Sequence, residues 1–148
     1  MYKDFFMEQA LLEAENAFYN NEVPVGAVVV KENIICGKGH NQVIKKKSVV
    51  AHAEIEAINK ASTFLKNYRL VDCDIYVTLE PCHMCLKAII DSRIKNLYFG
   101  ASEPKYGAVL SIDNFLLRNG INHNLNYSNG HMAERSAKLL KKFFESRR

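Results

Sequence analysis

The chain has 148 residues, of which 48% are apolar, so it is long enough for one globular domain with a hydrophobic core. No apolar run approaches the roughly 20 residues that cross a bilayer, and acidic residues interrupt the N-terminal segment, so we expect a soluble cytoplasmic protein without membrane contact. The net charge of +4 lies entirely in residues 131–148, which fits either a solvated helix face or a surface for a phosphate-bearing partner.

Helices and strands are predicted to alternate along the chain. Apolar residues recur at helical spacing over residues 3–20. Strands over 23–30 and 34–39 flank the turn Lys31–Asn33, and the first strand is apolar on both faces, which predicts a central position. The remaining expected elements are a helix over 51–62, a strand over 73–79, a helix from Pro81 to about Asp91, a strand over 96–100, a loop over 101–120 with a short helical patch, a strand at 125–127 and a final helix from Met132 onward.

This alternation predicts an α/β fold with three layers around a mixed sheet. We find no internal repeat, low-complexity tract or interdomain linker, so residues 1–148 are expected to form a single domain. We expect Phe144 to be a core residue that closes the final helix.

The motif Pro81-Cys82-His83-Met84-Cys85 places two cysteines three residues apart at a helix start. Residues at this spacing share a helix face, so both sulfur atoms can reach one point. The partial positive charge of a helix N-terminus lowers the pKa of a thiol. Taken alone, the motif fits a zinc site and a thioredoxin-like redox centre equally well.

His52 and Glu54, in the triplet His-Ala-Glu at the start of another helix, favour zinc. One histidine with Cys82 and Cys85 supplies three ligands and leaves a fourth, open position, as in catalytic zinc sites. Zinc lowers the pKa of bound water to about 7, and the water then needs a group that carries its proton. Glu54 is the natural candidate for that group.

The other cysteines and histidines have no partner pattern. Cys36 and Cys73 lie in apolar, strand-like stretches and are expected to be core residues without disulfides. His83 falls on a different helix face from the two motif cysteines, so we expect a pocket or surface residue. We expect ordinary roles for His40, His123 and His131.

The combination His-x-Glu and Pro-Cys-x-x-Cys resembles the cytidine-deaminase-like zinc deaminases, and the chain as a whole resembles the bacterial tRNA-specific adenosine deaminases among them. It departs from their usual pattern at Ser48–Val50, Lys87 and Glu103, none of which is a zinc ligand. The segments that carry the resemblance are 23–28, Asn41, 51–55, 67–70, 76–82, 99–101, 143–144 and 147–148.

The resemblance implies a three-layer α/β/α sandwich around a mixed five-stranded sheet, one zinc ion per chain and a homodimer. It implies hydrolytic deamination of adenosine to inosine at the wobble position of an arginine tRNA, with a zinc-activated water and Glu54 as proton shuttle. It also implies that Asn41 hydrogen-bonds the flipped nucleotide and that the backbone around Ala53 and Leu79 lines the base pocket. The residues that would hold flanking nucleotides are Glu103, Lys105, Arg147 and Arg148.

Three other functions fit parts of the pattern. A free-base or nucleoside deaminase for guanine or cytosine would use the same chemistry but would not need the basic C-terminal segment. A zinc-stabilised RNA-binding module without catalysis would have no use for Glu54. A thiol redox protein would have no use for the His-Ala-Glu triplet.

Overall fold

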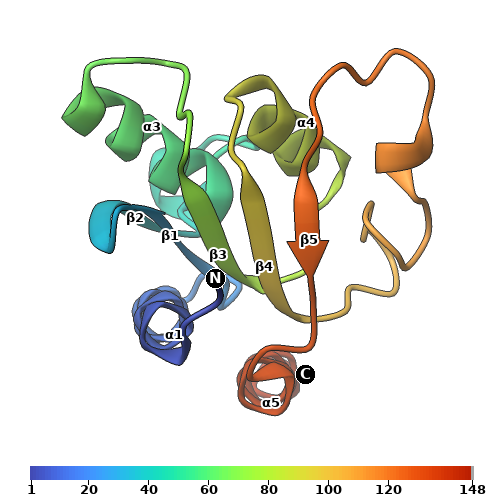
Figure 1. Ribbon diagram of the computed structural model, residues 1–148. Coiled ribbons are helices and arrows are strands. Elements are labelled where there is room, and N and C mark those ends of the chain that lie inside the picture. The colour runs from blue at the N-terminus through green and yellow to red at the C-terminus, as the bar shows by residue number, and fades with distance from the viewer. Residues whose placement is uncertain (148) are drawn as a thin grey trace.

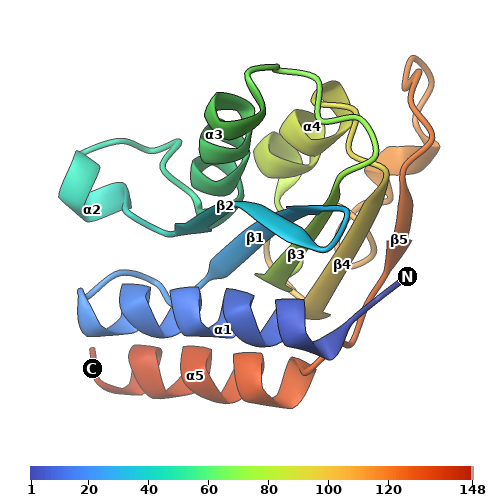
Figure 2. The same ribbon diagram turned by 60° about the vertical axis from the view of Figure 1, so that its left-hand side comes forward.

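The computed structural model describes residues 1–147 and shows a five-stranded sheet between two pairs of helices (Figure 1). Helices α1 and α5 cover one face of the sheet, and α3 and α4 cover the other, as both views show (Figures 1 and 2). This arrangement confirms the predicted three-layer α/β fold. The elements are α1 (Asp4–Tyr19), β1 (Gly26–Lys31), β2 (Ile34–His40), α2 (Val43–Lys46), α3 (Ala53–Leu65), β3 (Asp74–Leu79), α4 (His83–Asp91), β4 (Asn96–Ala101), η1 (Phe115–Leu117), β5 (Asn126–Ser128) and α5 (Ala133–Glu145).

The sheet is mixed, with the strand order β2-β1-β3-β4-β5. Strand β1 pairs antiparallel with both β2 and β3, whereas β3, β4 and β5 run parallel to one another. The first strand is therefore interior, and all of its residues except the last are buried, as its two apolar faces predict. Because β2 and β3 run in the same direction, their carboxyl ends lie at one edge of the sheet, where ligands bind in open α/β sheets.

Two apolar clusters form the core, one on each face of the sheet. The larger lies under α3 and α4 and includes Cys36 and Cys73, which are buried free cysteines, as expected. The smaller lies under α1 and is built around Phe6, Met7 and Tyr76. Helix α3 packs directly on β2. Gly39 permits this close contact, since a Cβ atom at that position would lie only 2.4 Å from the carbonyl oxygen of Ala53.

The element boundaries differ from the predicted ones in two informative places. The first strand begins at Gly26 rather than at residue 23, since Pro24 has no backbone N–H to contribute to a ladder. The polar stretch after β2 contains the short helix α2, which ends at Lys47 in the left-handed conformation. Among residues 1–147, no helix is long and apolar enough to cross a membrane.

Candidate active site

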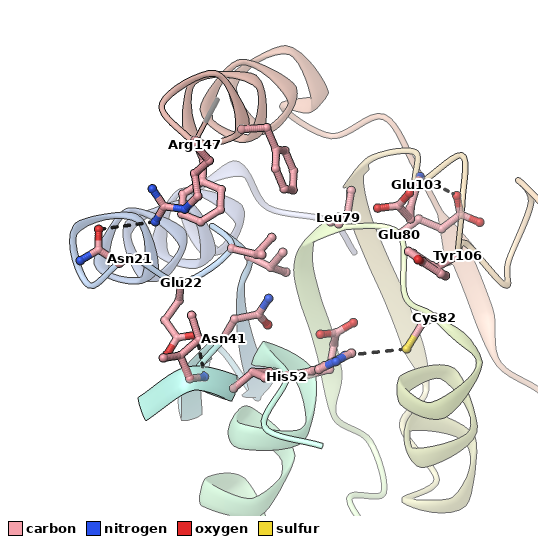
Figure 3. Close-up of a pocket in the computed structure, with 17 residues that line it drawn as sticks. Asn21, Glu22, Asn41, His52, Leu79, Glu80, Cys82, Glu103, Tyr106 and Arg147 are labelled. Atoms are coloured by element: carbon pink, nitrogen blue, oxygen red, sulfur yellow. Dashed lines mark hydrogen bonds between the residues drawn. The ribbon is translucent and has the colours of Figure 1, made fainter. Parts of the chain in front are cut away.

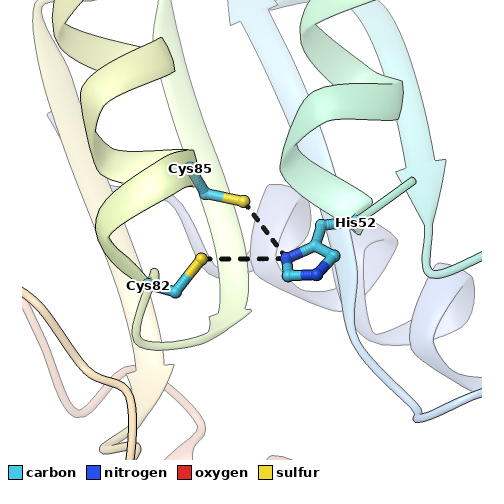
Figure 4. A group of neighbouring side chains, drawn as sticks. All are labelled: His52, Cys82 and Cys85. Atoms are coloured by element: carbon cyan, nitrogen blue, oxygen red, sulfur yellow. Dashed lines mark hydrogen bonds between the residues drawn. The ribbon is translucent and has the colours of Figure 1, made fainter. Parts of the chain in front are cut away.

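The side chains of His52, Cys82 and Cys85 meet at the carboxyl edge of the sheet (Figure 4). His52 is the residue before α3, Cys82 is the residue before α4, and Cys85 lies in the first turn of α4. Each half of the motif opens a helix, as the sequence predicted, and these two helix starts face each other. The three potential ligand atoms lie within 4.8 Å of one another.

The spacing of these atoms fits a tetrahedral zinc ion. The Nδ1 atom of His52 is 3.5 Å from the Sγ atom of Cys85 and 3.8 Å from that of Cys82. Zinc bonds of about 2.0 Å to nitrogen and 2.3 Å to sulfur, at tetrahedral angles, require a nitrogen–sulfur separation of about 3.5 Å. The donor set of one imidazole and two thiols is also one that zinc prefers. Because the chain supplies three donors, a fourth position would remain for water or substrate.

The pKa values of Cys82, Cys85 and His52 all depart from those of free thiols and imidazole. Hydrogen bonding to Cys85 and His52 lowers the pKa of the Cys82 thiol to about 4, although burial opposes the shift. The same contact with Cys82, together with burial, raises the pKa of Cys85. The hydrogen bond to Cys82 likewise raises the pKa of His52. The group thus readily provides one thiolate, and a divalent cation would favour the second.

Glu54 lies beside this group in the first turn of α3 and is only 4% exposed. Burial raises the pKa of its carboxyl group to about 7. A carboxyl group with a pKa near neutral pH can both accept and donate a proton during turnover, which is what general acid–base catalysis requires.

A cleft of about 690 Å³ opens over these residues (Figure 3). His52, Glu54 and Cys82 line its floor, and its size suits a nucleoside-sized ligand. The walls come from the segment after α1, from the end of β2 and α2, from the end of β3, from the loop after β4 and from α5. The residues that line these walls are Asn21, Glu22, Val23, Val25, Asn41, Val43, Ile44, Leu79, Glu80, Glu103, Tyr106, Phe143, Phe144 and Arg147.

Four of the residues that the sequence proposed for substrate binding line this cleft: Asn41, Leu79, Glu103 and Arg147. Two others do not. Ala53 is fully buried, and its N–H donates to the Asn41 side-chain oxygen at 2.8 Å, so Ala53 acts through Asn41. Lys105 is exposed on the loop after β4, where its N–H donates to the Glu103 carboxylate. Arg148 lies outside the described residues.

The end of α5 forms one wall, and here the prediction for Phe144 was wrong. Phe144 is 52% exposed and lines the cleft, whereas its neighbour Phe143 is 4% exposed and packs against Phe18. The Arg147 guanidinium lies 3.8 Å from the centre of the Phe143 ring, and its NH2 group donates to the Asn21 side chain. Phe143 therefore closes the helix on the core and positions Arg147 over the cleft.

The loop after β4 is held against the cleft by Glu80, which is only 2% exposed. Its Oε1 atom accepts the N–H of Glu103 at 3.1 Å and the hydroxyl of Ser111. Its Oε2 atom accepts the N–H groups of Val109, Leu110 and Ser111 at 3.1, 2.7 and 3.0 Å. Burial raises the pKa of this carboxyl group, but the hydrogen bonds outweigh burial and leave the pKa below its ordinary value.

Glu80 also explains Gly107 in the same loop. A Cβ atom at residue 107 would lie 2.3 Å from the Glu80 carboxyl carbon, so only glycine lets the loop close around it. This loop presents Glu103 and Tyr106 to the cleft. Glu80 binds the backbone at Glu103 and again at residues 109–111, so it holds the loop on both sides of Tyr106. Glu80 is thus the main link between the loop and the metal-binding edge.

A second buried carboxylate, Glu22, holds the opposite wall. It is 3% exposed and accepts the N–H groups of Ile44 at 3.1 Å and Lys45 at 2.9 Å. These bonds attach α2 to the turn that follows α1. Neither glutamate was predicted from the sequence, although Glu22 directly precedes one apolar stretch and Glu80 directly follows another, and an acidic residue that borders an apolar strand can be buried with it.

Two histidines outside the metal group behave as expected. His83 lies on the surface of α4, and its Nε2 atom is 2.8 Å from the Asp113 carboxylate. Arg118 contacts the same carboxylate, so this cluster joins α4 to the long loop after β4. His131 packs flat on Tyr2, with 3.8 Å between ring centres.

The sequence matches the family described as MafB19-like deaminase over residues 1–148. It is 43% identical to a tRNA-specific adenosine deaminase of Aquifex aeolicus, over 100% of this chain and 97% of the relative. It is 48% identical to the protein of the same name from Rickettsia bellii, over 94% of this chain and 97% of that relative.

The structure is also similar to solved structures of deaminases. A chain from a study of A-to-I editing by tRNA:A34 deaminases at the wobble position of transfer RNA has a TM-score of 0.91 at 41% identity, covering 93% of this chain and 100% of that one. A guanine deaminase from Nitrosomonas europaea has a TM-score of 0.82 at 21% identity, covering 96% of this chain and 84% of that one. At that identity the guanine deaminase shares the fold alone.

Proposed function

The chain belongs to the family of tRNA-specific adenosine deaminases, and on that premise we propose that it converts adenosine to inosine at the wobble position of tRNA by hydrolysis. The observation that carries the chemistry is the floor of the cleft, where a buried carboxyl group lies beside a His-Cys-Cys group with zinc-like spacing. The reaction consumes one water, replaces the exocyclic amine with oxygen and releases ammonia.

His52, Cys82 and Cys85 would hold one zinc ion per chain. When bound, zinc acts as a Lewis acid that lowers the pKa of water to about 7 and so supplies a nucleophile at neutral pH. The three donors lie at the starts of two helices that pack on the same face of the sheet, so the fold itself holds them in place.

Glu54 would move the protons. Its carboxylate accepts the proton that the attacking water loses, and its carboxylic acid then donates a proton to the base, so that the amine leaves as ammonia. A pKa raised by burial to about 7 keeps both forms accessible at neutral pH. The enclosed position of Glu54 at the cleft floor also limits exchange of this proton with bulk water.

Asn41 and Leu79 would orient the base. The side-chain oxygen of Asn41 already accepts the N–H of Ala53, so its Nδ2 group is left to donate to the nucleotide. Leu79 ends β3 and presents an apolar side chain to the cleft. An extruded base needs an apolar surface and a few directed hydrogen bonds, and these residues offer both.

Glu103, Lys105, Arg147 and Arg148 would contact the nucleotides that flank the base. The exposure of Phe144 next to Arg147 adds an aromatic face, on which an unstacked base can pack. We propose the anticodon loop of an arginine tRNA as the substrate, which places the enzyme in the cytoplasm. We also propose a homodimer, in line with exposed apolar side chains such as Tyr68 and Leu117.

Inosine formation in an arginine-tRNA anticodon stem-loop tests the function, with free guanine, cytosine and adenosine as competing substrates. We expect turnover of the stem-loop alone, and Glu54→Gln serves as the inactive control. Turnover of a free base without inosine in the stem-loop would refute the tRNA substrate. Light scattering of the purified protein tests the homodimer.

A further inference from the structure

The three consecutive lysines at 45–47 are not equivalent in the structure. Lys46 pairs with the carboxylate of Glu56, which is largely buried at the side of α3. Lys45 and Lys47 are exposed, and within residues 1–147 neither has a carboxylate oxygen within 4.0 Å of its ammonium group. The run therefore presents two free positive charges to solvent and one that is neutralised.

The backbone that carries these charges is fixed. Buried Glu22 accepts the N–H of Lys45 at 2.9 Å, and the N–H of Lys46 donates to the Gln42 carbonyl oxygen at 2.9 Å. The Lys46–Glu56 pair ties the same turn to α3. An ordered segment loses little conformational entropy on binding, so it is better suited to hold a ligand than a mobile lysine tail would be.

These lysines belong to a segment that borders the cleft, although they are not among its lining residues. The two residues before them, Val43 and Ile44, line it, and so does Arg147 at the end of α5. Figure 3 places Arg147 and α2 on different sides of the opening. A nucleotide whose base reaches His52 therefore has cationic side chains on two sides, of which the basic C-terminal segment provides only one.

We propose that Lys45 and Lys47 bind backbone phosphates of the RNA whose base enters the cleft. The inference rests on the proposed tRNA substrate, and it adds α2 to the RNA-binding surface. Two unpaired ammonium groups on one fixed turn suit a polyanion, whose successive phosphates can occupy both together. An acidic protein could also bind here, and the experiment below distinguishes that case.

The size of the effect follows from counterion release. Each phosphate neutralised on a single strand changes the slope of log K against log salt by about 0.7, so loss of two contacts should make the slope shallower by about 1.4. If binding at 1 M salt is unchanged, the affinity at 0.1 M falls about 25-fold. The difference should vanish as the salt concentration rises.

The test measures tRNA binding by Lys45→Gln/Lys47→Gln across a salt series. The matched control is Lys66→Gln/Lys95→Gln, which removes the same charge from two exposed lysines that, unlike Lys45 and Lys47, have no cleft-lining residue within four positions. Lys66 ends α3 in the left-handed conformation, as Lys47 ends α2, so it also matches the backbone. Zinc content and thermal unfolding check that both variants are folded.

We expect weaker binding and a shallower slope for the α2 variant alone, with KM raised and kcat unchanged. Equal losses in both variants would mean that net charge acts at long range, and this would overturn the inference. Unchanged tRNA binding by the α2 variant would overturn it too, and would leave a protein partner for this surface. If wild type binds tRNA but makes no inosine, the proposed function fails, while the binding comparison still decides the role of the lysines.

Discussion

Replacing Glu80 should release the loop after β4 without disturbing His52, Cys82 and Cys85. In Glu80→Gln, the remaining oxygen can keep the three N–H groups that Oε2 accepts, and the Ser111 hydroxyl can turn to accept from the new amide. The Glu103 N–H then faces the NH₂ group of the new glutamine and has no acceptor. A fully buried N–H without an acceptor costs about 1–3 kcal/mol, and because the Glu103 N–H is only partly buried, the free energy of unfolding should fall by about 1 kcal/mol, the lower end of that range.

Glu80→Ala removes every acceptor. Each of the three further N–H groups loses at least about 1 kcal/mol, so the total loss should exceed that of the glutamine variant by about 3 kcal/mol. Detachment of the loop limits the loss, because water then satisfies the freed N–H groups. The predicted order of stability is therefore wild type, then Glu80→Gln, then Glu80→Ala.

Hydrogen exchange and kinetics together measure this effect. The amides of Val109, Leu110 and Ser111 should exchange faster in Glu80→Ala, whereas in Glu80→Gln the Glu103 amide should exchange faster and those three should change little. Since Glu103 and Tyr106 come from this loop, KM for the stem-loop should rise more than kcat falls. Glu8→Gln, an exposed site with the same chemical change, is the control.

The reasoning would be refuted if the amides of residues 109–111 exchanged as slowly in Glu80→Ala as in wild type. It would also be refuted if the two Glu80 variants were equally stable, since the argument depends on the three bonds that glutamine keeps.

Three further predictions concern the metal, the proton carrier and pH. Cys82→Ala and Cys85→Ala should each lose zinc and stability, because zinc binding is coupled to folding, whereas Cys73→Ala in the core should retain zinc; metal analysis with thermal unfolding decides between them. Glu54→Gln should keep zinc but lower kcat by about 10²–10⁴-fold, since it removes the proton carrier, and near-normal turnover would assign that role elsewhere. Burial lowers the pKa of His131 below its ordinary 6.5, so the folded state resists protonation and this contribution to stability is lost as pH falls below that value. Acidification should accordingly destabilise wild type more than His131→Phe, and an equal loss of stability in the denaturation curves of both proteins would contradict this.

The sequence predicted the centre of the site better than its walls. His52, Cys82 and Cys85 could be grouped because each motif begins a helix, and the strands before them end at the same edge of the sheet. Local sequence therefore determines where these side chains go. Glu54 follows from His52 by its position in the same helical turn.

The walls depend on contacts between residues that are far apart in the sequence. Glu80 meets Ser111 and Glu22 meets Lys45 only after the sheet has formed, so no local pattern reveals either contact. The assignment of Phe144 failed for a different reason. Adjacent residues on a helix point about 100° apart, so two neighbouring phenylalanines leave open which of them faces the core.

The floor and the walls of the cleft are held in place by different contacts. Helices that pack on the sheet hold the floor, whereas α2 and the loop after β4 form two of the walls, and a buried carboxylate, Glu22 or Glu80, binds backbone N–H groups of each. Those carboxylates bind backbone N–H groups, which every residue but proline provides. Side chains on the walls, such as Ile44 and Tyr106, are therefore free to vary without displacing His52. A guanine deaminase shares this fold at 21% identity, so the fold tolerates wide variation in sequence.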